Sequence, residues 1–169
     1  MPTANTDMDP RPANPVIPVG RPGRAKWYVR GLLLAIGAGL AVVFAVAFYL
    51  NPYSADGTPR AMATHTQLGL PPCNFVTLTG RPCPACGMTT SFALLVRGDV
   101  GASLRANWAG TLLAAFWAVL MVWAVAGGLL GRALWIPPGR GELALTIAVG
   151  AFLVLMLGRW VGVLLTGGG

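Results

Sequence analysis

The residues best suited to chemistry are three cysteines and a histidine that lie close together in the sequence. They are His65, Cys73, Cys83 and Cys86, and the last two belong to the run Cys-Pro-Ala-Cys-Gly. The three are all the cysteines of the chain, and His65 is its only histidine. Thiolates and imidazole nitrogens bind zinc, and neighbouring thiols also exchange with disulfides.

Three interpretations of these residues stay open. In the first, Cys83 attacks a disulfide, Cys86 resolves the mixed disulfide and Cys73 relays it, although the chain lacks the βαβ context and the second cysteine pair usual in such proteins. In the second, His65 and the three cysteines are the four ligands of a structural zinc ion. In the third, the cysteines are buried thiols, with or without one disulfide, that let their segment pack closely on neighbouring helices.

The residues around the cysteines predict short helices. Pro84 suits the first turn of a helix, where its missing N–H costs nothing, and apolar residues at helical spacing follow it. These apolar residues are Met88, Phe92, Leu95 and Val96. We therefore expect Cys83 at or just before a helix N-terminus and Cys86 in the first turn, where the helix dipole lowers a thiol pKa.

The run Arg97-Gly98-Asp99 predicts the end of that helix and the start of another. Glycine commonly ends a helix, and aspartate is a favoured N-cap, here for a short helix through Arg105. Residues 68–106 are thus expected to form a helical hairpin that is amphipathic or partly re-entrant and lies against the membrane.

Several runs of this segment together resemble one family. They are Cys73-Asn74-Phe75, Leu78-Thr79-Gly80, Cys83-Pro84-Ala85-Cys86-Gly87-Met88-Thr89-Thr90, and Arg97-Gly98-Asp99 followed by Asn107. Over about residues 68–130 the chain resembles a bacterial membrane family, domain of unknown function 2752. Many members have arginine where this chain has Thr90 and proline where it has Trp108. The resemblance implies a bacterial membrane protein and supplies no mechanism.

The composition indicates that lipid surrounds most of the chain. Its 169 residues are 55% hydrophobic and 10% charged, whereas soluble domains carry about 25% charged residues. Apolar runs of spanning length cover residues 31–50, 108–130 and 143–165. We therefore predict an all-α integral membrane protein with about three transmembrane helices, and the cysteine hairpin between the first two.

Arg159 is an exception to the apolar third run. It lies six residues before the end of that run, beside Trp160. We expect its side chain to reach for the membrane interface. A functional charge within the membrane is the alternative.

The basic residues predict the orientation. Five lie before the first span, namely Arg11, Arg21, Arg24, Lys26 and Arg30, and two, Arg132 and Arg140, lie between the second and third. The positive-inside rule then places the N-terminus in the cytoplasm and residues 51–107 outside the inner (plasma) membrane, although that loop also holds four arginines. Residues 1–26 are rich in proline and arginine and are expected to be a disordered cytoplasmic tail, while residues 27–165 form one membrane domain.

The expected partners are the lipid bilayer and other membrane proteins or further copies of the chain. Although the net charge is +7, the basic residues form no folded patch, so nucleic acid is not expected. With five acidic residues, two of them in the tail, the chain offers few groups for acid–base catalysis. We therefore expect a non-catalytic structural or partner-binding protein whose hairpin is stabilised by packing or zinc, with a membrane thiol oxidoreductase using Cys83 and Cys86 as the alternative.

Overall fold

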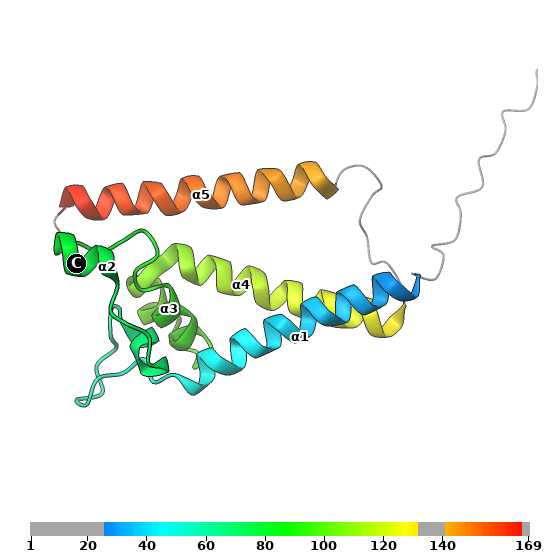
Figure 1. The fold of residues 1–169 in the computed structure, drawn as a ribbon, viewed down its shortest axis with the longest axis horizontal. Coiled ribbons are helices and arrows are strands. Elements are labelled where there is room, and N and C mark those ends of the chain that lie inside the picture. Colours follow the sequence, from blue (N-terminus) through cyan, green and yellow to red (C-terminus); the bar gives the residue numbers. More distant parts are fainter. Residues whose placement is uncertain (1–25, 132–140, 167–169) are drawn as a thin grey trace, which may run out of the picture.

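The computed structural model describes residues 26–131 and 141–166 (Figure 1). Its helices are α1 (Trp27–Tyr49), a short 3-10 helix η1 (Thr64–Leu68), α2 (Asn74–Thr79), α3 (Met88–Leu95), α4 (Val100–Leu130) and α5 (Gly141–Thr166). Residues 1–25 of the predicted tail, and Arg132 and Arg140 of the orientation argument, lie outside the described residues.

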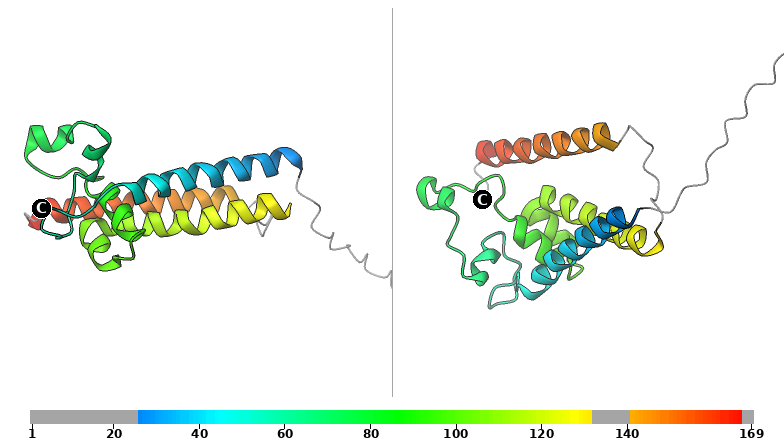
Figure 2. Two further views of the ribbon diagram at one scale, coloured as in Figure 1. Left: turned by 90° about the horizontal axis from the view of Figure 1, so that it is seen from below. Right: turned by 45° about the vertical axis from the view of Figure 1, so that its right-hand side comes forward.

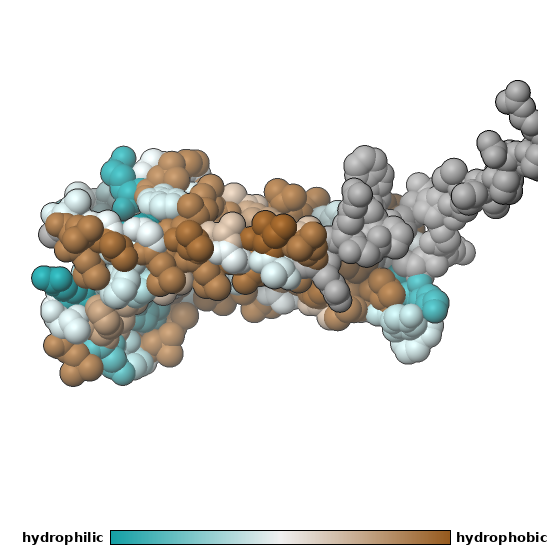
Figure 3. All heavy atoms as spheres, turned by 90° about the horizontal axis from the view of Figure 1, so that it is seen from above, coloured by the Kyte–Doolittle hydropathy of each residue, from teal (hydrophilic) through white to brown (hydrophobic). Residues whose placement is uncertain are grey.

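The predicted all-helical membrane fold is confirmed in the described ranges. Three helices are long and apolar enough to cross a bilayer, over Trp27–Tyr49, Val100–Leu130 and Leu143–Thr166. They run along the same long axis, and the cysteine-bearing segment between α1 and α4 gathers at one end (Figure 2). Figure 3 shows hydrophobic side chains over the middle of the molecule and hydrophilic ones towards its ends.

Small residues let α1 and α4 approach closely. Gly37 and Gly128 are buried at their contact, and a Cβ on Gly37 would lie 2.6 Å from a methyl group of Val125. Ala124, also buried, lies one turn from Gly128. Such small residues allow van der Waals contact between transmembrane helices. By contrast, the small residues Ala35, Gly39 and Ala41 of α1 are exposed.

Helix α3 packs against both of these spans. The buried Phe92 ring stacks on Phe44 of α1, with centroids 6.1 Å apart, and meets Trp117 of α4 edge-on at 5.6 Å. Phe44 and Trp117 belong to the candidate spans, so α3 packs against both of the helices between which the cysteine-bearing segment lies.

The junction between α3 and α4 forms as predicted. Gly98 adopts a left-handed φ of 81° after α3, and the Asp99 carboxylate accepts a hydrogen bond from the Ala102 N–H at the start of α4. Arg97 donates to the carbonyls of Ala93, Ala47 and Phe48. It thereby caps the last turns of both α3 and α1, where carbonyls lack helical partners.

Helix α4 is kinked at Asn107. This residue has the extended dihedrals φ −160° and ψ 98°, so the predicted short helix and the predicted second span are two arms of one element. The Gly110 N–H, which would otherwise bond the Ala106 carbonyl, instead donates to the Asn107 side-chain oxygen at 3.0 Å. The kink therefore leaves the Ala106 carbonyl available to another donor.

Candidate metal centre

Two separate loops supply the three thiols. Cys73 is the N-cap residue of α2, whereas Cys83 and Cys86 lie in the turn that precedes α3. Within that turn the Cys86 N–H donates to the Cys83 carbonyl at 3.0 Å and the Met88 N–H to the Ala85 carbonyl at 3.1 Å. The prediction that Cys86 belongs to the first helical turn is wrong, because α3 begins at Met88 after a left-handed Gly87.

The three sulfur atoms lie within 4.8 Å of one another. Cys83 Sγ and Cys86 Sγ are 3.0 Å apart, and the Cys83 N–H also donates to Cys86 Sγ at 3.1 Å. All three cysteines are half-buried free thiols. The fold thus brings Cys73 to the Cys83–Cys86 pair across nine residues of intervening chain.

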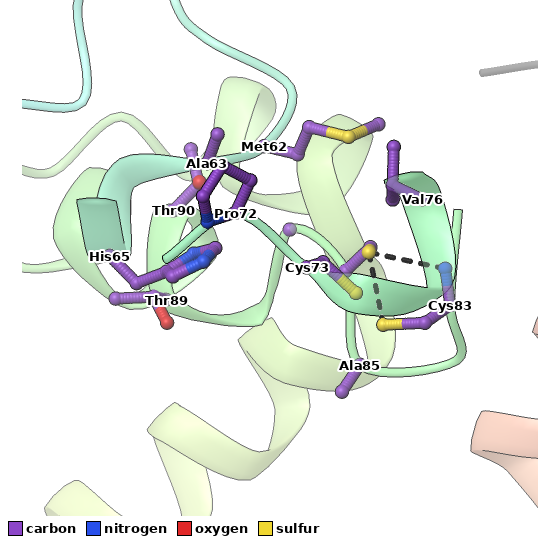
Figure 4. Close-up of a pocket in the computed structure, with 12 residues that line it drawn as sticks. Met62, Ala63, His65, Pro72, Cys73, Val76, Cys83, Ala85, Thr89 and Thr90 are labelled. Atoms are coloured by element: carbon purple, nitrogen blue, oxygen red, sulfur yellow. Dashed lines mark hydrogen bonds between the residues drawn. The ribbon is translucent and has the colours of Figure 1, made fainter. Parts of the chain in front are cut away.

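A cavity of about 320 Å³ lies beside the sulfur atoms (Figure 4). His65, Met62, Thr89 and Thr90 line it together with the cysteines. In Figure 4, His65 occupies the side of the cavity opposite the cysteines, and it is not one of the residues whose ligand atoms lie within 4.8 Å. The predicted fourth ligand therefore shares the cavity but does not touch the sulfur cluster.

Buried hydroxyls hold the walls of this cavity in place. Thr64 of η1, adjacent to His65, shares a 2.7 Å hydrogen bond with Thr90 of α3, and both side chains are buried. Behind them, Ser103 donates to the Ser91 carbonyl at 2.8 Å and pairs with Thr111 at 2.7 Å. These hydroxyl bonds join α3 to η1 on one side and to α4 on the other.

The cysteine turn is fastened directly to the kink of α4. Asn107 donates from its amide nitrogen to the Cys86 carbonyl at 3.1 Å. Gly87 lies so close to α4 and to the loop before η1 that an added Cβ would be 2.7 Å from the Ala106 oxygen and 2.8 Å from the Ala61 oxygen. Asn107 entered the sequence argument only through the family resemblance, and its fully buried amide is what gives it this role.

Helix α5 reaches the same place. Arg159 donates to the free Ala106 carbonyl at 3.0 Å, and Trp160 donates from its indole nitrogen to the Pro82 carbonyl at 2.9 Å. The guanidinium of Arg159, which we expect to reach for the membrane interface, is half-buried and binds a protein carbonyl at the end of the molecule where the cysteine-bearing segment lies. The physical reason is the kink at Asn107, which provides an acceptor that a regular helix would have used internally.

The protonation of the thiols follows from their surroundings. Burial, together with hydrogen bonding to the Cys83 thiol, raises the pKa of Cys86 to about 12. The Val76 N–H at the start of α2 lowers the pKa of Cys73 below its usual value. Cys73 therefore loses its proton more readily than Cys86.

Comparison with known proteins agrees with the resemblance found in the sequence. Residues 73–123 match the model of a family described as "Protein of unknown function (DUF2752)". This range contains the three cysteines, α3 and most of α4. No curated protein and no solved structure matches the chain.

Proposed function

We propose that this multi-pass membrane protein is a non-catalytic, partner-binding protein whose cysteine module, residues 61–107, is built around one structural zinc ion. The observation that carries the proposal is that three thiol sulfurs, supplied by two loops, lie within 4.8 Å of one another. Structural zinc sites favour thiolate and imidazole ligands in tetrahedral sets. Convergence of three such ligands on one point is what a metal centre requires and what a single disulfide does not.

The spacing of the sulfurs fits zinc after a small adjustment. A Zn–S bond of about 2.3 Å in tetrahedral geometry places neighbouring sulfurs about 3.8 Å apart. The distance of 3.0 Å between Cys83 Sγ and Cys86 Sγ then has to increase by about 0.8 Å. Rotation of these two half-buried side chains provides that increase. In this proposal His65 closes the site as the fourth ligand by turning across the cavity that it lines.

The chemistry of the cavity wall supports a structural role. None of the twelve residues that line it is a carboxylate. Asp99 is engaged as the N-cap of α4, and Asp56 binds Thr58 in an exposed turn. The described lining therefore offers no carboxylate as the general acid or base of a hydrolytic zinc enzyme, whereas a closed Cys₃His set needs none.

The proposed orientation places the cysteine module outside the inner membrane of a bacterium. The module and the end of α5 lie at one end of the molecule, and the start of α1 lies at the other (Figure 1). Lys26 and Arg30 lie at the α1 start, which supports a cytoplasmic location for that end. The module's exposed side then faces other extracytoplasmic or membrane partners.

Metal analysis of the full chain tests the zinc proposal. Reduced protein in lipid nanodiscs, loaded with zinc and desalted, is expected to hold about one zinc per chain. Cys73→Ser and Cys83→Ser are expected to lose it, and His65→Ala to bind it more weakly, since each removes a ligand. Met62→Leu, at a cavity residue that is no ligand in the proposal, is the control. Wild-type protein free of zinc after this treatment would overturn the proposal.

A second function is favoured by the short contact between Cys83 and Cys86. Sulfurs 3.0 Å apart need little movement to reach a disulfide bond of about 2.05 Å. In that case the two thiols lose two protons and two electrons to a partner's disulfide, which is reduced to two thiols. Cys86→Ser would then trap the partner on Cys83 as a mixed disulfide, a species that the zinc proposal does not produce.

Labelling in intact cells tests the orientation. We replace the three native cysteines by serine and introduce a cysteine at Ala55, which is exposed in the turn between α1 and η1. A membrane-impermeant maleimide should label this cysteine without permeabilisation. Labelling that requires permeabilisation would invert the proposed topology.

A further inference from the structure

We propose that one turn of α5, Arg159 and Trp160, belongs to the metal centre as its positioning residues, so that zinc binding and docking of α5 strengthen each other. The inference rests on the proposed zinc site and goes beyond it by assigning a role to the third transmembrane helix. Neither residue is a ligand. Both act through the loops that carry the thiols.

Trp160 ties together the two loops that supply the sulfurs. Its indole N–H donates to the carbonyl of Pro82, the residue before Cys83. The edge of the same ring system meets Phe75, two residues after Cys73, with centroids 5.9 Å apart and planes at 70°. One side chain thus fixes the distance between the loops on which convergence of the thiols depends.

Arg159 supports the turn that carries the third thiol, Cys86. Its guanidinium donates to the Ala106 carbonyl, and that oxygen is the nearest atom to a Cβ built on Gly87, the residue after Cys86. The adjacent Asn107 binds the Cys86 carbonyl itself. The guanidinium charge is also close enough to the Cys86 thiol for the two groups to interact electrostatically.

The net charge of the proposed zinc centre also favours a cation at the position of Arg159. Three thiolates and one Zn²⁺ carry a net charge of −1, and a neutral imidazole leaves that charge unchanged. A half-buried centre of this kind is stabilised by a nearby fixed cation, since partial burial weakens solvent screening. Arg159 is a cation of this kind, because it binds the Ala106 carbonyl that lies against Gly87 of the cysteine turn.

The most apolar part of α5 is not buried against the rest of the chain. None of the residues in its most apolar window is buried. The hydrogen bonds of Arg159 and Trp160 tie the other end of the helix to the cysteine-bearing segment and to the kink of α4. Because coupling between two equilibria is reciprocal, a turn that raises zinc affinity must itself be held more firmly when zinc is bound.

The test measures zinc affinity by competition with a chelator, using full-length protein in nanodiscs. Substitution of a group that orients metal ligands typically costs about 10–100-fold in affinity. We expect Arg159→Met to weaken zinc binding by about that factor, and Arg159→Lys to recover most of it by restoring the charge. Trp160→Phe, which removes one hydrogen bond, should cost about 5-fold. The matched controls are Arg105→Met and Trp27→Phe, at exposed residues outside the cluster.

A second readout follows α5 directly. Protein labelled with 5-fluorotryptophan should show a ¹⁹F resonance, assigned by its loss in Trp160→Phe, that shifts or sharpens when zinc is added. Equal zinc affinity in all variants and controls, or a Trp160 resonance indifferent to zinc in wild-type protein, overturns this inference alone. Absence of zinc from the wild-type chain overturns the proposed function and this inference together.

Discussion

Replacement of Gly87 by alanine tests how closely the cysteine turn is packed. Gly87 has φ 81° and lies between the backbone of α4 and the loop before η1. An alanine at this position destabilises the fold for two reasons. A Cβ disfavours the left-handed conformation, and it would meet two carbonyl oxygens, on Ala106 and Ala61, that belong to backbone and have no freedom to rotate away.

The two costs can be estimated separately. The left-handed conformation costs an L-residue about 1–2 kcal/mol. The Cβ–oxygen distances of 2.7 and 2.8 Å fall below the 3.0 Å that real Cβ atoms observe, so the turn and α4 must separate. Separation breaks the hydrogen bond from Asn107 to the Cys86 carbonyl, worth about 1 kcal/mol, and overpacking in a rigid site adds about 1–3 kcal/mol. We expect Gly87→Ala to lower the free energy of unfolding by about 3–6 kcal/mol.

Gly98→Ala is the matched control for this experiment. Gly98 has the same φ of 81°, and a Cβ built on it has no neighbour within 4 Å. The control should therefore show the conformational cost alone. Equilibrium unfolding of both variants in mixed micelles, followed by circular dichroism, gives the difference, and zinc content reports on the site. Equal destabilisation by the two substitutions would refute the close packing described for Gly87.

Three further predictions concern the supports of the module and its thiols. Arg97→Met should lower the free energy of unfolding by about 2–3 kcal/mol, because carbonyls at the ends of α1 and α3 lose a charged donor. The control Arg105→Met, at an exposed site, should have little effect in the same unfolding assay. Ser103→Ala should cost about 1–2 kcal/mol by leaving the Ser91 carbonyl without its buried donor, and an unchanged unfolding midpoint would contradict this. In reduced, metal-free protein, alkylation by iodoacetamide with mass-spectrometric mapping should modify Cys73 before Cys86, because the pKa of Cys73 is lowered and the pKa of Cys86 is raised to about 12. The pKa of Cys86 in the folded protein lies above its usual 9.0, so the folded state favours the neutral Cys86 thiol. The contribution of this neutral thiol to the stability of the fold is therefore lost as the pH rises from about 9 to 12.

The helical membrane fold could be predicted from the sequence because hydropathy is a local property. A run of about 20 apolar residues forms a spanning helix whatever its neighbours are. The junction at Gly98 and Asp99 was predictable for the same reason, since helix ends depend on a few adjacent residues. By contrast, the start of α3 was misplaced by four residues, from Pro84 to Met88. The turn at Gly87 makes long-range contacts with Ala61 and Ala106, and these contacts decide where the helix begins.

The candidate site was predictable only in part, since its partners are distant in sequence. The spacing of Cys83 and Cys86 implies their proximity, but the approach of Cys73 depends on how α2 folds back onto the turn. His65 shares the cavity because Thr64 binds Thr90, a contact between two residues that are 26 positions apart. Nothing near Arg159 in the sequence reveals its partner on α4. That partner, the Ala106 carbonyl, lies 53 residues earlier and is an available acceptor only because the helix is kinked at Asn107.

The docking of α5 also bears on the order in which the molecule is completed during synthesis. Trp160 lies 78 residues after Pro82, the carbonyl that it binds. At a translation rate of about 5–20 residues per second, the ribosome needs roughly 4–16 s to make that stretch. For nearly all of this interval the three thiols already exist on a nascent chain that lacks the Trp160 contact between their two loops. In the proposed centre, ligands that are made early are therefore brought together last. A chain interrupted between residues 86 and 159 would carry all its cysteines without this contact.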